Sequence, residues 1–429
     1  MHPRTGLPVV GMVGAGQLAR MTHQAGISLG QSLRLLAASA DDSAALVAPD
    51  TVLGDYLSYD DLLAFAAGCD VVTFDHEHVP TEHLRRLVEA GYAVRPGPDA
   101  LLHAQDKQVM RERLDAAGVP VPRWAPVATA ADVERFAAEV GWPLVAKASR
   151  GGYDGKGIWI CREVGQVEAL LASGVPLLVE ELVPLRRELA AVVARSPFGQ
   201  GAAWPIVETV QRDGICVEVL APAPDLSADL AAQAQELGLV LARELDVVGI
   251  LAVELFETPD GRILVNELAM RPHNSGHWTI EGSRTSQFEQ HLRAVLDYPL
   301  GATTPTAPVV VMANILAAAG EPPPGSGPSL DERVHHCAAR WPAVKVHLYG
   351  KQPRPGRKIG HVTALGADLA EVRAAATAAA RYLSGAEGLS GAEGLSGAEG
   401  LSGADGSSGA DGSSGDGVPT KVDEQEGGR

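Results

Sequence analysis

Short apolar runs alternate with amphipathic helical patterns over the first hundred residues of the chain. The apolar runs predict strands at 7–13, 33–38 and 70–74, and the patterns between them predict helices at 17–27, 60–67 and 81–90. Regular alternation of strand and helix is typical of a parallel sheet with helices on both faces. We therefore predict a Rossmann-like α/β domain over residues 1–105.

The pattern changes near residue 106. Helices are predicted at 106–117 and 129–140, and strand-rich sequence follows to about residue 269, with strands at 143–148, 158–161, 177–181 and 188–194. After proline-rich linkers the chain returns to short strands and then to an alanine-rich helix at 367–382. These patterns predict a second domain of α+β type over 106–300 and a small β-rich domain over 301–383.

Residues 384–429 repeat LSGAEG and then SSGADG with a six-residue period. Glycine, serine and alanine bury too little apolar area to offset the entropy of ordering them, so we predict a disordered acidic tail. The tail holds nine acids and two bases, which is seven of the 18 excess negative charges. The net charge of the chain therefore says little about any site in the folded part.

Composition excludes several classes of protein. Apolar residues at 46% and charged residues at 21% are typical of a globular chain, whereas aromatic residues at 4% and a net charge of −18 argue against a single-stranded nucleic-acid binder. The four cysteines form no CxxC pair and no signal segment is recognisable, so we expect a reduced, cytoplasmic protein. No apolar run reaches the roughly 20 residues that a membrane span needs.

The segment GAGQLA, which begins at Gly14, follows the first predicted strand and opens a helix. Such a loop lets backbone N–H groups approach a phosphate, or it allows only tight packing, and both interpretations stay open. A dinucleotide site expects an acid at the end of the second strand, but acids first appear at Asp41 and Asp42. A nicotinamide-dinucleotide oxidoreductase is therefore the weaker alternative, from a different functional class.

A glycine-rich segment from Lys147 to Gly157 joins two predicted strands. It is not a Walker loop, because Lys156 is followed by Gly157 instead of serine or threonine and no helix follows. The pattern favours a mobile flap that closes over phosphates, with a long surface hairpin as the alternative. The chain has 28 arginines and only seven lysines, so we interpret Lys147 and Lys156 as selected for phosphate contact.

Two glutamates lie on either side of a predicted hairpin. An Asp-Gly turn at 260–261 between apolar runs places Glu254 directly opposite Glu267. Cross-strand side chains have Cβ atoms about 5 Å apart, so the two carboxylates repel unless a cation compensates them. A Mg²⁺–ATP site explains this pair, and two glutamates splayed toward solvent at a sheet edge are the alternative.

Three further polar segments surround these candidates. Arg271 opens the turn RPHNSGH directly after the second glutamate strand, beside the expected phosphates. Residues 333–367 contain seven basic side chains and no acid, which indicates an anion funnel, a solvated basic face or a subunit contact. The segment DHEH at 75–78 ends a parallel strand, where such sheets bind ligands, so we favour a substrate contact by Glu77 over zinc bound by His76 and His78.

The motifs GAGQLARM, GGYDGKG, NELAMRPHNSGHW and YGKQPRPGRKIGH together resemble the ATP-grasp superfamily and, within it, the 5-(carboxyamino)imidazole ribonucleotide synthetase family of purine biosynthesis. The resemblance covers residues 7–383 and implies an ATP-grasp domain over 106–300. It implies a ligase that uses ATP and bicarbonate to carboxylate the exocyclic amine of 5-aminoimidazole ribonucleotide through carboxyphosphate, with one or two Mg²⁺ ions, in a cytoplasmic homodimer. A formate-dependent glycinamide ribonucleotide transformylase and the carboxylase subunit of a biotin enzyme are the alternatives within the superfamily, and the segment RPGRKIGH argues against both.

The resemblance also implies site residues. Those expected to contact ATP are Lys107, Lys147, Gly152, Tyr153, Asp154, Gly155, Lys156, Gly157, Ile158, Glu180, Glu181, Leu182, Val183, Glu188, Gln211, Asn266 and Glu267. Those expected to face the ribonucleotide or carboxyphosphate are Gly16, Gln17, Leu18, Glu77, Tyr153, Arg271, His273, Asn274, Lys351, Arg357 and Lys358. Arg271, His273, Asp154 and Lys351 are the expected catalytic residues, and Glu254 and Glu267 the metal ligands. Two positions depart from the family pattern, because Gln211 replaces a common histidine and Ala269 a common asparagine.

Overall fold

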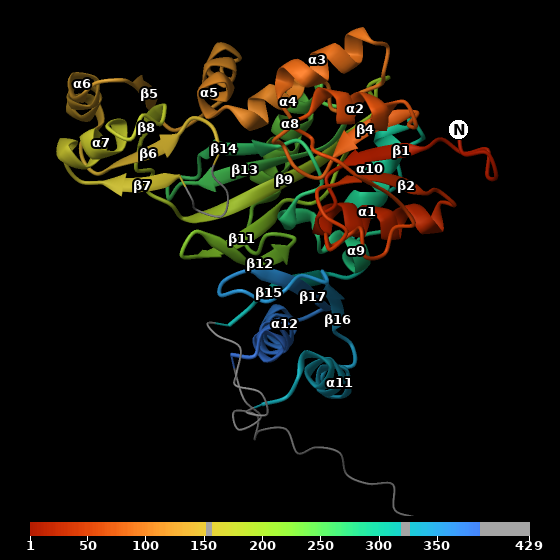
Figure 1. Cartoon of the computed structure of the whole chain (residues 1–429). Coiled ribbons are helices and arrows are strands. Elements are labelled where there is room, and N and C mark those ends of the chain that lie inside the picture. The colour runs from red at the N-terminus through yellow and green to blue at the C-terminus, as the bar shows by residue number, and fades with distance from the viewer. Residues whose placement is uncertain (152–156, 319–326, 387–429) are drawn as a thin grey trace, which may run out of the picture. The chain divides into compact units, whose positions relative to one another are not determined.

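The computed structural model describes residues 1–151, 157–318 and 327–386. Figure 1 shows three sheets: a parallel sheet near the N-terminus, a small sheet beside α6 and α7, and a large sheet that links the centre of the chain to its C-terminal strands. Among the described residues, no helix is long and apolar enough to cross a membrane.

The N-terminal sheet is parallel and has the strand order β3-β2-β1-β4. Its elements are β1 (Val10–Val13), α1 (Gln17–Ser28), β2 (Leu33–Ala37), β3 (Asp50–Leu53), α2 (Tyr59–Ala66), β4 (Val71–Phe74) and α3 (Thr81–Glu89). Every residue of β1 and β4 is buried, as expected for strands covered on both faces. The predicted parallel sheet is confirmed, but β3 was not predicted, because this short edge strand is only partly buried and has a weak apolar pattern.

The helix predicted at 106–117 is confirmed, and a second helix that was not predicted directly precedes it. They are α4 (Pro98–Gln105) and α5 (Lys107–Ala116), separated by Asp106. Asp106 has an extended backbone, and its carboxylate accepts hydrogen bonds from the backbone N–H groups of Gln108 and Val109, so it ends one helix and caps the next. The backbone N–H of Lys107 donates to Ser149 O at 2.8 Å, which ties the start of α5 to the end of a neighbouring strand.

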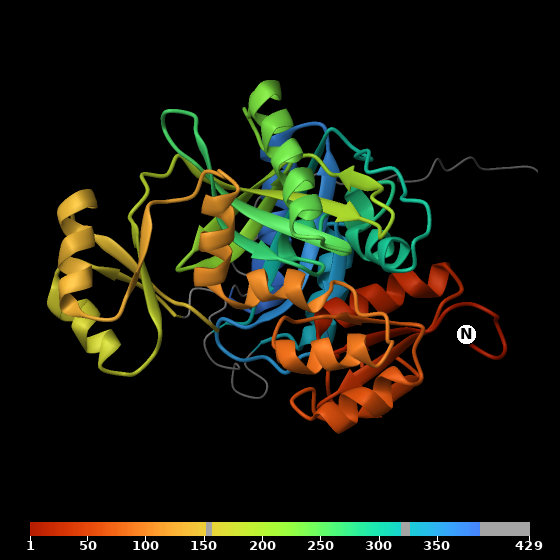
Figure 2. The same ribbon diagram turned by 90° about the horizontal axis from the view of Figure 1, so that it is seen from above.

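The small sheet is antiparallel with the order β5-β8-β6-β7. Its elements are β5 (Trp124–Val127), α6 (Ala130–Val140), β6 (Leu144–Ala148), β7 (Ile158–Cys161), α7 (Val164–Leu171) and β8 (Leu177–Glu181). The two helices pack on the sheet through a buried apolar cluster that includes Val133, Phe136 and Val167. Figure 2 shows this lobe, in orange and yellow, to one side of the green strands of the large sheet.

The large sheet is antiparallel with the order β14-β13-β9-β11-β12-β15-β17-β16, and β10 pairs with β9. Its strands are β9 (Arg187–Arg195), β10 (Gly201–Ala203), β11 (Val207–Arg212), β12 (Ile215–Ala221), β13 (Gly249–Glu257), β14 (Ile263–Ala269), β15 (Val309–Leu316), β16 (Lys345–Leu348) and β17 (Lys358–Gly366). Because β12 pairs with β15, the sheet runs without a break across residue 300, where we predicted a domain boundary. The domain boundaries themselves stay predictions.

Helices cover the large sheet along its length. They are α8 (Ala228–Glu244), α9 (Thr279–Gly282), α10 (Gln287–Val295), α11 (Leu330–Arg340) and α12 (Leu369–Ser384), with a short 3-10 turn at Asn274–Gly276. The predicted alanine-rich helix corresponds to α12, which packs with α11 against β15 and β17. Neither α8 nor α11 was predicted, since we interpreted these parts of the chain as strands and linkers.

Candidate active site

The β13–β14 hairpin pairs Glu254 with Glu267, which confirms the predicted register of the two glutamates. The predicted two-residue turn is wrong, however, because Thr258 pairs with Arg262 across a three-residue loop that ends at Gly261, whose φ is 79°. The register then shifts by one at a β-bulge, where Asn266 is the extra residue of β14. The bulge offsets the longer turn and restores the opposition of the glutamates.

This bulge has a direct consequence for side-chain direction. Consecutive residues of a regular strand point to opposite faces of a sheet, but Asn266 and Glu267 both line one cavity. Lys147 Nζ donates to Asn266 Oδ1 at 3.0 Å, and Lys107 Nζ lies 2.8 Å from Glu267 Oε1. The bulge therefore brings the amide oxygen of Asn266 to Lys147 and the carboxylate of Glu267 to Lys107 along the same wall.

Two cavities adjoin at the hairpin. The larger has a volume of about 550 Å³ and lies between the small sheet and the large sheet. The polar cavity, of about 340 Å³, lies between the large sheet and the N-terminal domain. Five residues line both cavities: Glu254, Glu267, His273, Asn274 and Lys358. A group bound in one cavity can therefore meet a group bound in the other at this shared wall.

The larger cavity has an apolar end and a charged end, as a nucleotide site requires. The apolar side chains are those of Val145, Ile158, Ile160, Leu182, Val183, Leu185 and Phe256. The predicted ATP contacts that line the cavity are Lys147, Ile158, Glu180, Glu181, Leu182, Val183, Glu188, Gln211, Asn266 and Glu267. Gly157 precedes β7 with φ 76°, while the predicted residues Gly152, Tyr153, Asp154, Gly155 and Lys156 lie outside the described part of the chain.

The charged end contains a buried ion cluster around Glu180. Its carboxylate lies 2.7 Å from the guanidinium of Arg111 and 2.7 Å from Lys147 Nζ. Burial acts to raise the pKa of Glu180, but the two cations outweigh it, so this pKa is lowered and the carboxylate stays ionised. Arg111 was missed in the sequence, although its place four residues after Lys107 puts both on one face of α5.

Glu188 lines the same cavity near the glutamate pair. Burial and the neighbouring charge of Glu254 raise the pKa of Glu188 to about 7, against a lowering by the side-chain hydrogen bond from Gln211. Glu254 itself has a lowered pKa, because its interaction with His273 and the nearby Lys358 outweighs its burial. The Glu254 carboxyl group is therefore ionised, whereas the Glu188 carboxyl group titrates near neutrality.

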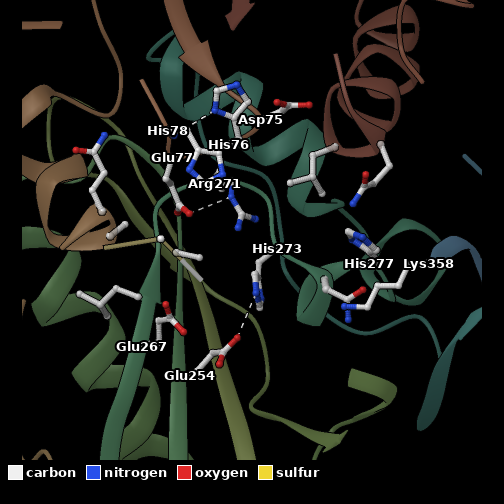
Figure 3. Close-up of a pocket in the computed structure, with 18 of the residues that line it drawn as sticks. Asp75, His76, Glu77, His78, Glu254, Glu267, Arg271, His273, His277 and Lys358 are labelled. Carbon is white, nitrogen blue, oxygen red and sulfur yellow. Dashed lines mark hydrogen bonds and ion pairs between the residues drawn. The ribbon is translucent and has the colours of Figure 1, made fainter. Parts of the chain in front are cut away.

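Charged and imidazole side chains line much of the polar cavity, and Figure 3 shows Arg271 directed toward Glu77 and His273 toward Glu254. Glu77 Oε1 accepts a hydrogen bond from the backbone N–H of Met270 at 2.8 Å, and Glu77 Oε2 lies 3.3 Å from Arg271 Nε. His273 Nε2 lies 3.3 Å from Glu254 Oε1, and its Nδ1 lies 2.9 Å from Ser275 Oγ. Glu77 thus orients the Arg271 guanidinium, and Glu254 faces the His273 ring.

The side chain of Asp75, which follows β4, packs against the glycine loop between β1 and α1. Asp75 accepts a hydrogen bond from the backbone N–H of Gly16, and a Cβ at Gly14 would lie 1.8 Å from Asp75 Oδ1. Burial raises the pKa of Asp75 to about 6, although the Gly16 N–H, Arg271 and Lys351 act to lower it. The tight-packing interpretation of the glycines therefore has direct geometric support, with a carboxylate where a phosphate was the alternative.

The remaining predicted substrate contacts divide into two groups. Gln17 and Leu18 line the polar cavity, and Lys351 donates a hydrogen bond to Gln17 Oε1, so a residue of the C-terminal segment reaches the start of α1. Arg357 donates to the carbonyl oxygen of Gln352 at 3.2 Å and lines neither cavity. Gly16 also lies outside the linings and instead binds Asp75, as described above.

The structure gives no support to zinc binding by the DHEH segment. The rings of His76 and His78 stack with centroids 5.3 Å apart, and the backbone N–H of His78 donates to His76 Nδ1. Within residues 1–151, 157–318 and 327–386, no three His, Cys, Asp or Glu side chains are grouped so as to hold a metal ion. The candidate metal donors are the paired carboxylates of Glu254 and Glu267 and the amide oxygen of Asn266.

Three family models match successive parts of the chain. The ribonucleotide synthetase preATP-grasp domain matches residues 7–105, the ATP-grasp domain matches residues 112–288, and the phosphoribosylaminoimidazole carboxylase C-terminal domain matches residues 310–375. The fold and the cavity between its two antiparallel sheets therefore define an ATP-grasp protein.

Named relatives narrow this class. The chain is 62% identical over 381 residues to N5-carboxyaminoimidazole ribonucleotide synthase of Mycobacterium tuberculosis, covering 88% of each chain, and 52% identical over 391 residues to that of Corynebacterium ammoniagenes, covering 88% of this chain and 92% of that one. The solved synthetase of Thermus thermophilus is 38% identical with a TM-score of 0.77, covering 87% of this chain and 98% of that one. An Aspergillus clavatus synthase in complex with ADP and 5-aminoimidazole ribonucleotide is 30% identical with a TM-score of 0.78, covering 88% and 98%. The chain belongs to the N5-carboxyaminoimidazole ribonucleotide synthase family, which confirms the resemblance found in its motifs.

Proposed function

We propose that the chain uses ATP and bicarbonate to carboxylate the exocyclic amine of 5-aminoimidazole ribonucleotide through carboxyphosphate, with release of ADP and phosphate. The observation that carries this proposal is the pair of adjoining cavities with Glu254, Glu267, His273, Asn274 and Lys358 in their common wall. The Aspergillus relative was solved with ADP and the ribonucleotide together, so one member of the family accommodates both molecules at once.

The nucleotide occupies the larger cavity in this proposal. The adenine packs in the apolar end and meets backbone groups of 180–183, while Glu188 accepts hydrogen bonds from ribose hydroxyl groups. Lys107 and Lys147, which lie beside Glu267 and Asn266, contact the phosphates as compact positive charges. The segment 152–156, with Tyr153, Asp154 and Lys156, is proposed to close over them.

The donor set at the hairpin suits Mg²⁺. Glu254 and Glu267 present carboxylates on paired strands, and Asn266 adds an amide oxygen through the bulge, so all three donors are the hard oxygen ligands that Mg²⁺ prefers. One or two bound Mg²⁺ ions would neutralise triphosphate charge at this wall. Lys107, 2.8 Å from Glu267, carries a positive charge at the same place.

We assign a role in the reaction to each of several side chains of the site. Lys147 and Arg271 stabilise the charge that develops on the transferred phosphoryl group, and Glu77 holds the Arg271 side chain toward the cavity. His273 is the proposed acceptor of the amine proton, and Glu254, 3.3 Å from its Nε2, would stabilise the imidazolium that forms. Lys351 and Gln17 bind the ribonucleotide at the start of α1. Asp154 is the alternative proton acceptor and lies outside the described residues.

ADP release tests this proposal when it is measured with Mg²⁺–ATP while bicarbonate and 5-aminoimidazole ribonucleotide are omitted in turn. We expect release at full rate only when both are present, with mass spectrometry detecting the carboxylated ribonucleotide. ADP release that needs neither compound would contradict the proposed reaction. Formate replacing bicarbonate would instead indicate a transformylase.

We further propose a cytoplasmic homodimer, as the resemblance implies. The four cysteines form no disulfide bond in the described part of the chain, which suits a reducing compartment. Light scattering on the eluting peak of a size-exclusion column tests the oligomeric state, and a mass of one chain at micromolar concentration would contradict the dimer.

A further inference from the structure

Arg111 is a buried cation that reaches the metal-ligand strand without lining either cavity. It lies on α5 and is 1% exposed. Its Nε donates to Glu180 Oε1 at 2.8 Å, its Nη1 donates to the carbonyl oxygen of Val265 at 3.2 Å, and its Nη2 donates to that of Asn266 at 2.8 Å. The guanidinium therefore joins a helix, a strand of the small sheet and a strand of the large sheet.

The two carbonyl groups belong to the residues that form the bulge. A bulge leaves its extra residue outside the regular ladder, so its conformation needs support from another group. The planar guanidinium supplies it by contacting two successive carbonyl oxygens and one carboxylate, an arrangement that the single ammonium of a lysine does not reproduce. Without that support, β14 can return to regular alternation and turn either Asn266 or Glu267 away from the cavity.

The same contacts close a loop of polar interactions around Asn266. Arg111 binds its carbonyl oxygen, Lys147 binds its side-chain oxygen at 3.0 Å, and Glu180 binds both cations. Because Glu180 has two cationic partners, Lys147 can move to a phosphate while Arg111 still balances the buried carboxylate. Arg111 thus holds β14 and balances the charge of Glu180 while Lys147 contacts the nucleotide phosphates.

We propose that Arg111 is a positioning residue that holds the β14 bulge and thereby directs Asn266 and Glu267 together at the bound cation and phosphates. This inference rests on the proposed function of the same site. It assigns Arg111 an indirect role, since the side chain acts through the backbone of the residues that meet the ligand.

The test uses Arg111→Lys, which keeps a positive charge beside Glu180 but loses the two-carbonyl contact. The matched control is Arg113→Lys, two residues further along α5, where the partly exposed Arg113 contacts Glu244. We measure the Kd of ADP by calorimetry with and without Mg²⁺, on the full chain. Supporting contacts around metal ligands are typically worth 10- to 100-fold in metal affinity, so we expect the Mg²⁺-dependent gain in ADP affinity to fall about tenfold or more in Arg111→Lys. ADP affinity without Mg²⁺ should stay within about twofold, and the control should match the wild type.

Two outcomes would overturn the inference: a wild-type Mg²⁺ dependence in Arg111→Lys, or equal losses of affinity with and without Mg²⁺. If Arg111→Lys does not fold, Arg111→Met removes the two carbonyl contacts while Lys147, at 2.7 Å, still pairs with Glu180, and the same Mg²⁺-dependent loss is expected of it. This test is independent of the proposed reaction, because ADP binding needs no ribonucleotide. The proposed reaction fails if the wild type forms no carboxylated ribonucleotide.

Discussion

Single side chains of the site are held by partners that no sequence pattern links to them. Gln287 is fully buried at the start of α10, and its amide accepts from the backbone N–H of His273 at 2.9 Å and donates to the His273 carbonyl oxygen at 2.7 Å. The same amide nitrogen lies 3.0 Å from His277 Nδ1. One glutamine thus binds both polar groups of the His273 backbone and contacts the His277 ring.

Gln287→Met should lower kcat about 10- to 100-fold, because loss of these contacts displaces the His273 ring from Glu254 and the reacting amine. The matched control is Gln290→Met on the same helix, where a buried glutamine makes the same double contact with the backbone of Gly301. Both variants should lose on the order of 1–3 kcal/mol of stability in urea unfolding. Equal loss of kcat in the two variants would mean that Gln287 has no special role at the site.

Glu188 should make stability depend on pH near neutrality. Its carboxyl has a pKa of about 7 in the folded chain, against 4.5 as the ordinary value, so the folded state binds the proton more tightly than the unfolded state. Its contribution to stability is therefore full below pH 4.5 and is lost as the pH rises through about 7.

The experiment is urea unfolding of the wild type and of Glu188→Gln without nucleotide. Between about pH 5 and pH 8, the unfolding free energy of the wild type should fall relative to the variant by on the order of 1–3 kcal/mol. Parallel pH profiles for the two proteins would show that Glu188 titrates at its ordinary value.

At the scale of elements, the sequence pattern predicted those helices, strands and turns that depend on neighbouring residues. The Asp-Gly turn at 260–261 identified the hairpin and, by register, the glutamate pair. The bulge at Asn266 could not be predicted, because it depends on carbonyl contacts from Arg111, 155 residues away from Asn266 in sequence. The start of α5 at Asp106 agrees with the prediction, whereas α8 was missed although it carries a helical period with Ser227 as its cap, so that error came from a misread local pattern.

The loop between β1 and α1 shows how one element specifies another. Gly14 has φ 100°, and any Cβ there would overlap the Asp75 carboxylate that follows β4. The glycine pattern was visible in the sequence, but the group that fills the loop comes from a different strand. A phosphate and a carboxylate make similar demands on backbone N–H groups, so the pattern alone left both interpretations open.

Gly14→Ala should therefore destabilise the chain by on the order of 3 kcal/mol or more, because positive φ and overlap with Asp75 add together. The control is Gly91→Ala, where φ is 92° but no atom lies within 4 Å of the new Cβ, and the expected loss is about 1 kcal/mol. Thermal and urea unfolding of both variants measure the difference. Equal losses would show that Asp75 moves away at no cost.

At the scale of the whole molecule, the polar cavity is assembled from three distant parts of the chain. Gln17 and Glu77 come from the N-terminal domain, Glu254 and Arg271 from the central strands, and Lys358 from β17. The C-terminal segment also bonds directly to the first domain, since Ser43 Oγ donates to the carbonyl oxygen of Tyr349. The sequence motifs predicted which residues line the site. That these residues come together in one cavity depends on the order of strands in the large sheet.

Truncation after residue 386 should leave stability and activity unchanged, because the removed sequence is the repetitive tail that we predicted to be disordered.

Truncation after residue 368 should instead abolish folding. It removes α12, whose buried Val372, Tyr382 and Leu383 pack with Ile315 and Val362 of the large sheet. Burial of such side chains is worth about 1.5–3 kcal/mol each, so their sum approaches the whole stability of a domain. Since β17 also carries Lys358, loss of this support would open the wall shared by the two cavities. Unfolding temperatures and ADP release rates of both truncations test this, with the shorter chain expected to fail and the longer chain to stay within about 2 °C of the full chain. If the longer chain folds but turns over slowly, the acidic repeats act on the enzyme.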